Sequence, residues 1–395
     1  MARFKKKSDY VLIENRIKRH KKQKLMIIIG IVVVLAVISV CLINAYINRV
    51  FDAYKVEKAI KDSISSEAQY LSYGDNVLRV SRDGVCAYSP SGNILFNGSY
   101  DMRNPSADIC DDYVAVADIG NYSVYVFDGS NSGKQITVTL PILQVQVAKQ
   151  GVVAVLMEDK DTNVIRLYNS ESSVNDVLVE TLTNVDKNGF PVNIALSDDG
   201  KKLVTNYVTV KNGIINSGVT FYNFSEVGQN EVNRMVGAKD YGNSIVSDVD
   251  FIGSDTVCVY TDTGFDLFEM PEKNTEVFSK KFDREIKSTF HTDSYIGFVL
   301  DTDSSEGQSQ MLIYNTSGKE VYNGNIDFSY DKVSMSDKEV IFTSESEGHI
   351  VKLNGVQKYK DTFETNVDTI LPINNYNKYF LIDNNNVNVI KLTED

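Results

Sequence analysis

Two acidic loops carry the residue types and spacing that could bind a metal ion. The loop DTDSSEG places Asp301 and Asp303 at alternate positions, and the loop EDKDTN does the same with Asp159 and Asp161. Carboxylates at this spacing are ligands that Ca²⁺ prefers, but an EF-hand also needs a glycine at its sixth position and a glutamate at its twelfth. The loop that starts at Asp301 has neither. We keep both loops as candidates for weak cation binding, beside the simpler interpretation of solvated hairpin turns.

Residues for catalysis are scarce. Only three histidines occur, and His20 belongs to a basic N-terminal stretch, which leaves His291 and His349 in separate parts of the chain. No G-x-S-x-G motif is present, so a serine hydrolase of the α/β type has no support. The stretch DGSNSGK (128–134) lacks the glycine and the hydroxyl residue that a phosphate-binding loop needs. The sequence therefore predicts no catalytic residues and no cofactor.

The N-terminal region predicts a membrane anchor. Residues 25–47 form an apolar run without a charge, and about 20 such residues are enough for a helix to cross a bilayer. Residues 1–24 contain ten basic and two acidic residues, and a basic flank stays in the cytoplasm. No small-residue cleavage site follows the run. We expect an uncleaved, single-pass anchor in the lipid of the cell membrane, with the remainder of the chain outside.

The predicted external part is acidic. The whole chain of 395 residues has a net charge of −13, although its N-terminal segment is basic. An acidic surface repels nucleic acid, so we expect no nucleic-acid partner. It suits cationic partners or divalent ions, and it also keeps a domain soluble.

One hairpin pattern recurs along the external part. The stretch YVAVADIGNYSVYVF (113–127) has two alternating apolar runs around a polar turn, which is the pattern of a two-stranded hairpin. Similar hairpins follow at intervals of 39 to 54 residues. A period of 40–50 residues with room for four strands is typical of propeller blades. We predict an all-β propeller over residues 69–395, with eight blades or alternatively seven, in which the last blade lacks its outer strand.

The segment between anchor and propeller, residues 48–68, places Phe51, Tyr54, Ile60 and Ile64 near one face of a helix. That spacing predicts a short helical stalk.

Two longer stretches carry a family resemblance. GFPVNIALSDDGKKLVTNYVTV (189–210) and GVTFYNFSEVGQNEVNRMVG (218–237) resemble an uncharacterised family of single-pass, membrane-anchored β-propellers from Firmicutes, described as a domain of unknown function. The resemblance covers residues 69–395. It implies a cell-surface propeller and brings no catalytic residues. The pattern ALSDDGKKL is more distantly similar to WD40-like and YVTN-type repeats, but the chain has no tryptophan, so the WD signature is absent.

One hairpin departs from the regular plan and marks a candidate partner-binding surface. Its tip, VKNGIINSG (210–218), lengthens the hairpin and exposes two isoleucines after an Asn-Gly turn. An extended hairpin creates an edge strand that can pair with a partner. The long segment SEVGQNEVNRMVGAKDYGNS (225–244) comes next, and long connections are often functional. The partner-binding candidates are Lys211, Asn212, Ile214, Ile215, Gln229, Asn233 and Arg234.

Together these features predict a membrane-anchored, non-catalytic scaffold that binds a surface protein or a cell-wall component, with no small-molecule ligand. The alternative is a glycan- or cation-dependent enzyme or sensor. It would need a funnel of carboxylates with raised pKa values at the channel of the propeller.

Overall fold

The computed structural model describes residues 2–61, 68–130, 133–160, 162–170, 177–184, 189–302, 308–373, 376–383 and 386–394. The chain divides into two compact units, Met1–Val50 and Phe51–Asp395. The first unit is one helix, α1 (Ala2–Ile47). Its part His20–Tyr46 (27 residues) contains an 18-residue window with a mean hydropathy of 3.4, so by length and composition it can span a membrane. The helix also continues through most of the basic segment before the apolar run.

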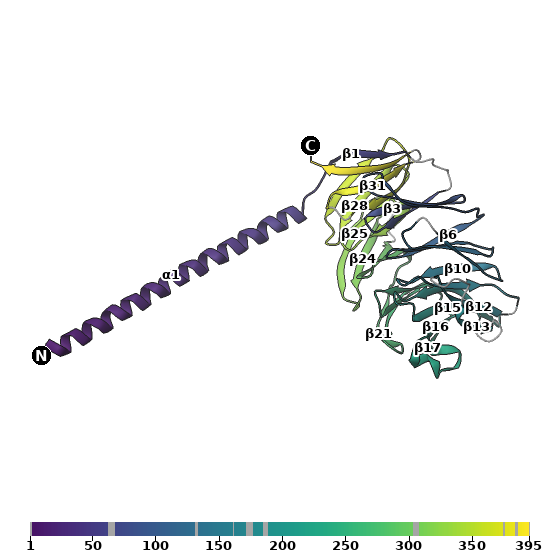
Figure 1. The fold of residues 1–395 in the computed structure, drawn as a ribbon, viewed down its shortest axis with the longest axis horizontal. Helices are drawn as coiled ribbons and strands as arrows, with labels where there is room; N and C mark the ends of the chain where they lie inside the picture. The colour runs from purple at the N-terminus through teal and green to yellow at the C-terminus, as the bar shows by residue number, and fades with distance from the viewer. Residues whose placement is uncertain are drawn as a thin grey trace. The chain divides into compact units, whose positions relative to one another are not determined.

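The second unit is a propeller of eight blades, each a four-stranded antiparallel sheet. Figure 1 shows the blades following one another from blue through green to yellow. The count of eight confirms the first of the two alternatives predicted from the hairpin period. In each blade we call the first strand inner and the last strand outer.

The strands of blades one to four are β2 (Gln69–Tyr73), β3 (Asn76–Ser81), β4 (Gly84–Tyr88), β5 (Ile94–Ser99), β6 (Pro105–Cys110), β7 (Tyr113–Asp118), β8 (Ser123–Phe127), β9 (Lys134–Thr137), β10 (Ile142–Val147), β11 (Val152–Met157), β12 (Thr162–Asn169), β13 (Val177–Asn184), β14 (Phe190–Leu196), β15 (Lys202–Lys211), β16 (Ile214–Asn223) and β17 (Met235–Gly242). Between β16 and β17 lie α3 (Glu226–Gln229) and the 3₁₀ turn η1 (Val232–Arg234).

The strands of blades five to eight are β18 (Val246–Ile252), β19 (Thr256–Thr261), β20 (Gly264–Glu269), β21 (Thr275–Lys281), β22 (Ile286–His291), β23 (Tyr295–Asp301), β24 (Ser309–Asn315), β25 (Glu320–Ile326), β26 (Lys332–Met335), β27 (Glu339–Thr343), β28 (Glu347–Lys352), β29 (Gln357–Thr362), β30 (Val367–Pro372), β31 (Lys378–Asp383), β32 (Val387–Thr393) and β1 (Ala53–Ile60).

Position within a blade explains the strand sequences. The middle strands are covered on both faces by the neighbouring blades, so β4 and β27 are buried at every residue. The outer strand β5 alternates between buried and exposed residues, because one of its faces meets water. The fully apolar runs of the hairpins are therefore the middle strands.

The predicted helical stalk over 48–68 is wrong for the residues that the structure describes, which leave out Ile64 and the rest of 62–67. Residues Ala53–Ile60 form strand β1, which pairs antiparallel with β32 and becomes the outer strand of blade eight. Figure 1 shows the purple β1 beside the yellow C-terminal strand. The helical spacing of apolar residues was misleading, since a strand that lies on one blade edge and contains a bulge after Val56 also buries only some of its side chains. The outer strand that the sequence lacked in the last blade is supplied from the N-terminus.

Phe51 fixes the start of this closing strand. Its backbone N–H donates to the carbonyl of Lys358 on β29 (2.8 Å), and its side chain is only 5% exposed. The ring contacts that of Tyr376 with 5.9 Å between centroids. Phe51 therefore links blade seven to blade eight at the point where the propeller unit begins.

Apolar packing between blades forms the core. The buried residues fall into eight clusters, and each cluster combines side chains of two neighbouring blades. The cluster that joins blades seven and eight includes Phe51, Tyr359 and Tyr379. The stability of each blade therefore depends on the blades beside it.

We predict that Phe51→Ala destabilises the propeller by about 3–5 kcal/mol, the usual loss when a buried phenylalanine is truncated. Denaturant unfolding of the full-length chain in detergent, followed by near-UV circular dichroism, measures this. Val56→Ala on the same strand is the matched control, because Val56 is 53% exposed and surface truncations change stability by less than about 0.5 kcal/mol. Equal losses for the two variants would contradict the closing role of Phe51.

Candidate functional site

The hairpin β15–β16 extends beyond the rest of blade four. Its two strands have ten residues each, and no other strand of the described propeller is as long. The pairing of β15 with β14 ends at Val208, and the pairing of β16 with β17 ends at Ser217. The ribbon 209–216 is therefore a two-stranded projection, and neither of its edges is paired by a strand of the described chain.

The tip of this ribbon has the predicted turn. Asn212 and Gly213 have positive φ angles of 53° and 77°, as a two-residue type I′ turn requires. Apolar side chains crowd the tip, since Val210 is 70% exposed, Ile214 57% and Ile215 50%. Val210 lies directly opposite Ile215, so these two side chains share one face of the ribbon.

The remaining predicted partner residues lie at the other end of the hairpin. Gln229 ends α3, and Asn233 and Arg234 form the end of η1, all after the C-terminus of β16. Ten strand residues at about 3.4 Å each make β16 about 30 Å long. The structure therefore separates the predicted set into a tip group and a distal group at opposite ends of β16, and the two groups do not form one surface.

A second difference concerns the length of the segment after β16. The sequence predicts one long connection over 225–244, but Met235–Gly242 is the outer strand β17. Asn233 and Arg234 have positive φ angles of 54° and 61°, a conformation that is uncommon for residues other than glycine. These two residues turn the chain into β17, which is a structural reason for their presence.

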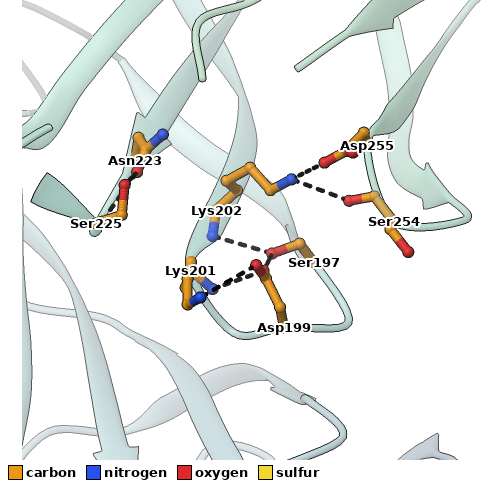
Figure 2. A network of polar contacts seen from close by, with 8 residues as sticks. All are labelled: Ser197, Asp199, Lys201, Lys202, Asn223, Ser225, Ser254 and Asp255. Carbon is orange, nitrogen blue, oxygen red and sulfur yellow. Dashed lines mark hydrogen bonds and ion pairs between the residues drawn. The ribbon is translucent and has the colours of Figure 1, made fainter. Parts of the chain in front are cut away.

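Polar contacts hold the distal end of blade four in place (Figure 2). The Ser197 hydroxyl donates to the Asp199 carboxylate (2.7 Å), and the Lys202 backbone N–H donates to the Ser197 hydroxyl (3.0 Å). Gly200 closes this turn with a φ of +66°. These contacts form a Ser-x-Asp-Gly turn within the stretch ALSDDGKKL.

The same network, drawn in Figure 2, reaches blade five. The Lys202 ammonium donates to the backbone carbonyl of Ser254 (3.1 Å) and pairs with the carboxylate of Asp255. On the next strand, the side-chain oxygen of Asn223 accepts from the Ser225 hydroxyl (2.6 Å) just before α3. Blade four is therefore braced at its distal end, while its tip projects freely.

Exposed apolar side chains gather around blade four. Of the seventeen large hydrophobic side chains that are exposed in the described propeller, ten lie between residues 177 and 235. They belong to β13, β14, the ribbon, η1 and the start of β17. Monomeric soluble proteins rarely expose large contiguous apolar patches without a function. These side chains lie at both ends of blade four, and the three at the ribbon tip, Val210, Ile214 and Ile215, form the candidate interaction surface.

A second group of side chains, missed in the sequence, lies on the inner strands. Asp248 and Asp250 alternate on β18, and the carboxylate of Asp250 lies 3.2 Å from Nε2 of His291 on β22. The Asn193 amide of β14 donates to Asp248 (2.8 Å). On β6, Asp108 accepts from the backbone N–H of Val147 on β10 (2.6 Å). The motif DVD (248–250) could have indicated this group from the sequence, because alternate residues of a strand point to the same side and its two aspartates would lie together.

The environment changes the protonation of these groups. Burial raises the pKa of Asp108 to about 7, partly opposed by the hydrogen bond from Val147 and reinforced by Asp250. Burial and the nearby charge of Asp250 raise the pKa of Asp248 to about 6. Burial is the largest single influence on His291 and lowers its pKa, but the hydrogen bond to Asp250 and the charges of Asp250, Asp248 and Asp293 together outweigh it, so the pKa of His291 is raised. The enzyme or sensor alternative needs a funnel of such carboxylates at the channel, and the structure provides two carboxylates with raised pKa values on inner strands, Asp108 and Asp248.

The acidic loops do not assemble into a metal site in the part of the chain that the structure describes. Asp161 and Asp303 lie outside the described residues. Asp301 forms an ion pair with Lys287 (2.8 Å), and Asp159 caps the backbone N–H of Lys160. Among the described residues no group of three or more His, Cys, Asp or Glu side chains is arranged to hold a metal ion.

A cavity of about 730 Å³ lies beside the inner strands of blades seven, eight and one. The hydroxyls of Ser72, Ser334 and Thr369 line it together with apolar side chains. Its charged lining consists of Lys332 and Asp368, which pair with each other at 2.5 Å. The cavity thus presents a neutral lining.

Comparisons with known proteins agree with the fold. Residues 47–392 match the sequence model of a "Family of unknown function (DUF5711)". Among curated proteins, none matches the sequence.

Solved structures with a similar fold include BamB from Moraxella catarrhalis, with a TM-score of 0.54, 11% identity, and coverage of 86% of this chain and 100% of that one. A structure described as "the eukaryotic initiation factor" has a TM-score of 0.53 and 10% identity, and covers 84% of this chain and 87% of that one. At these identities the likeness concerns the fold alone.

We predict that Asp108→Asn stabilises the propeller at pH 8 and has no effect near pH 4. The raised pKa means that the folded state favours the protonated carboxyl, so the native Asp108 costs stability increasingly as the pH rises from 4 to 7. Replacing the carboxyl should raise the free energy of unfolding by on the order of 1–3 kcal/mol at pH 8. Thermal unfolding of the full-length chain at both pH values measures this, with the exposed Asp101→Asn as control. A stabilisation that is equal at the two pH values would contradict the prediction.

Proposed function

We propose that the chain, which belongs to the DUF5711 family of unknown function, is a membrane-anchored scaffold whose external propeller binds another surface protein. No catalytic step is assigned to it. The helix α1 serves as the anchor, with its basic flank in the cytoplasm by the positive-inside rule. The propeller then lies outside the cell membrane.

The observation that carries this proposal is the apolar surface around blade four. Protein interfaces have apolar centres with polar rims, and the tip of the ribbon exposes Val210, Ile214 and Ile215 together. A cell-wall glycan is a poorer match, because hydroxyl-rich ligands need many hydrogen-bonding side chains. We therefore prefer a protein partner to a wall component.

A sensor is the second candidate, and the inner-strand carboxylates favour it. Asp108 and Asp248, with pKa values raised to about 7 and about 6, change charge near neutral pH. Their contacts join neighbouring blades, β6 to β10 and β14 to β18. A change in external pH would then alter the contacts between blades, and through them the binding of a partner.

We expect the triple variant Val210→Thr, Ile214→Thr, Ile215→Thr to lose partner capture at least about tenfold, which corresponds to about 1.4 kcal/mol of contact energy. Threonine keeps the β-branched shape that strands prefer and removes apolar surface. In-cell crosslinking of the tagged full-length chain through lysines, followed by mass spectrometry, measures the yield.

The matched control for this experiment is Val277→Thr with Val321→Thr, two valines that are 45% and 43% exposed on the outer strands of blades five and six. We expect their capture yield and unfolding midpoint to equal those of the unmodified chain. Capture that survives in the triple variant would place the partner surface elsewhere on the propeller.

If the sensor candidate is right, the yield of the captured partner differs between pH 5.5 and pH 8 in the unmodified chain. In Asp108→Asn, which carries no titrating carboxyl at this site, the difference should shrink by more than half. Equal yields at the two pH values in the unmodified chain would count against the sensor and leave the scaffold in place.

A further inference from the structure

The ribbon has an edge that the blade itself leaves open. Strand β17 runs beside β16 only as far as Gly242, which pairs with Ser217. There the chain turns away, with Gly242 at a φ of 60° and its N–H bound by Asp240 (2.8 Å). The next strand is then tied back toward the disc, because the Val246 N–H donates to the Ser217 hydroxyl (3.1 Å). This turn leaves residues 214–216 of β16 paired with β15 on one edge and with no described strand on the other.

The geometry of a hairpin decides which backbone groups are available on that edge. In a two-residue turn the flanking residues, Lys211 and Ile214, form a hydrogen-bonded pair. In antiparallel strands such pairs alternate with non-hydrogen-bonded pairs, whose N–H and C=O point away from the partner strand. Ile215, opposite Val210, is therefore a residue whose backbone N–H and C=O point outward from the β16 edge.

The ribbon lacks most of the features that protect edge strands. Exposed edges are usually blunted by charges, prolines or bulges. From Tyr207 to Asn223 the sequence holds one charged residue, Lys211, and no proline. The pairing of β15 with β16 shows no bulge from Lys202 to Lys211, and the nearest register shift in the pairing of β16 with β17 lies at Ser217 and Gly218, outside residues 214–216. The β16 edge of the ribbon is therefore available for pairing with a strand of another protein.

We propose that the β16 edge at Ile214–Asn216 binds an extended segment of the partner protein, which adds to blade four as a fifth strand in line with β17. This proposal rests on the proposed scaffold function and specifies where the scaffold contacts its partner. The backbone of the segment pairs with the N–H and C=O of Ile215. Its apolar side chains cover Val210 and Ile215 on one face of the ribbon.

Charge indicates the composition of that segment. The chain from Phe51 onward carries many more acidic than basic residues, so a neutral or basic segment is attracted and an acidic one is repelled. A second copy of this chain would bring an equally acidic propeller against the first. The occupant that the surface fits is therefore a neutral or basic strand of a different protein.

The first measurement is hydrogen exchange, with D₂O as the probe. The full-length chain is compared in native-membrane nanodiscs and after purification in detergent. We expect the outward amide of Ile215, measured within the segment 209–217, to exchange at least about tenfold more slowly in native membranes, since a paired edge amide must open before it exchanges. Equal exchange in the two samples would overturn strand addition.

Proline variants separate the backbone contact from apolar contact. Ile215→Pro removes the outward N–H from the β16 edge, whereas Val210→Pro removes the corresponding N–H from the opposite, β15 edge. Ile215→Val keeps the N–H and most of the apolar surface. We expect Ile215→Pro to lose partner capture at least about tenfold, and the other two variants to retain it, with all three unfolding at the midpoint of the unmodified chain.

The outcomes distinguish the two proposals. If the unmodified chain captures a partner and Ile215→Pro captures it equally well, strand addition is wrong and the scaffold function stands. If the unmodified chain captures no protein and shows no protection of 209–217 in native membranes, both are wrong. If Ile215→Pro unfolds earlier than the unmodified chain, the exchange comparison alone decides.

Discussion

Packing between blades is the interaction on which the rest of this structure depends. A single four-stranded blade cannot bury its apolar faces by itself, and stacking against its neighbours buries them. Each of the eight core clusters joins two neighbouring blades, so every blade needs both of its neighbours. The ring must therefore close, and β1 closes it by pairing with β32. The strand that follows the N-terminal helix is thus part of the fold and not a spacer.

This dependence also explains where the chain tolerates irregularity. The inner and middle strands are confined between neighbours, but the end of a hairpin is not. Blade four lengthens its hairpin by residues 209–216 without disturbing the clusters at either side, because Val204 and Phe221 stay in the cluster with blade five and Leu203 and Tyr222 in the cluster with blade three. Contacts such as Lys202 with Ser254 brace the distal end of the same hairpin. A rigid base with a free apolar tip is well suited to present a binding surface.

The inner strands carry polar side chains that connect neighbouring blades but cost stability when they ionise. Contacts between their polar side chains link neighbouring blades, as Asp250 does with His291. Placing carboxyls such as Asp108 among buried atoms costs stability once they ionise. The propeller therefore combines apolar packing between blades with polar contacts between inner strands, among them that of Asp108, whose raised pKa supports the sensor proposal. The scaffold and sensor proposals are compatible, because one rests on the ribbon tip and the other on the inner strands.

The sequence by itself determined the apolar helix, the four-strand repeat and the Asn212-Gly213 turn, because each is a local pattern set by hydrophobic period or backbone conformation. It did not determine that residues 53–60 form a strand, since the partner of β1 lies more than 300 residues away in the sequence. Nor did it show that Ile215 and Arg234 lie at opposite ends of β16, or that Asp108 and Asp250 influence each other. Those relations depend on how the strands pair and how the ring closes, and only the tertiary structure decided them.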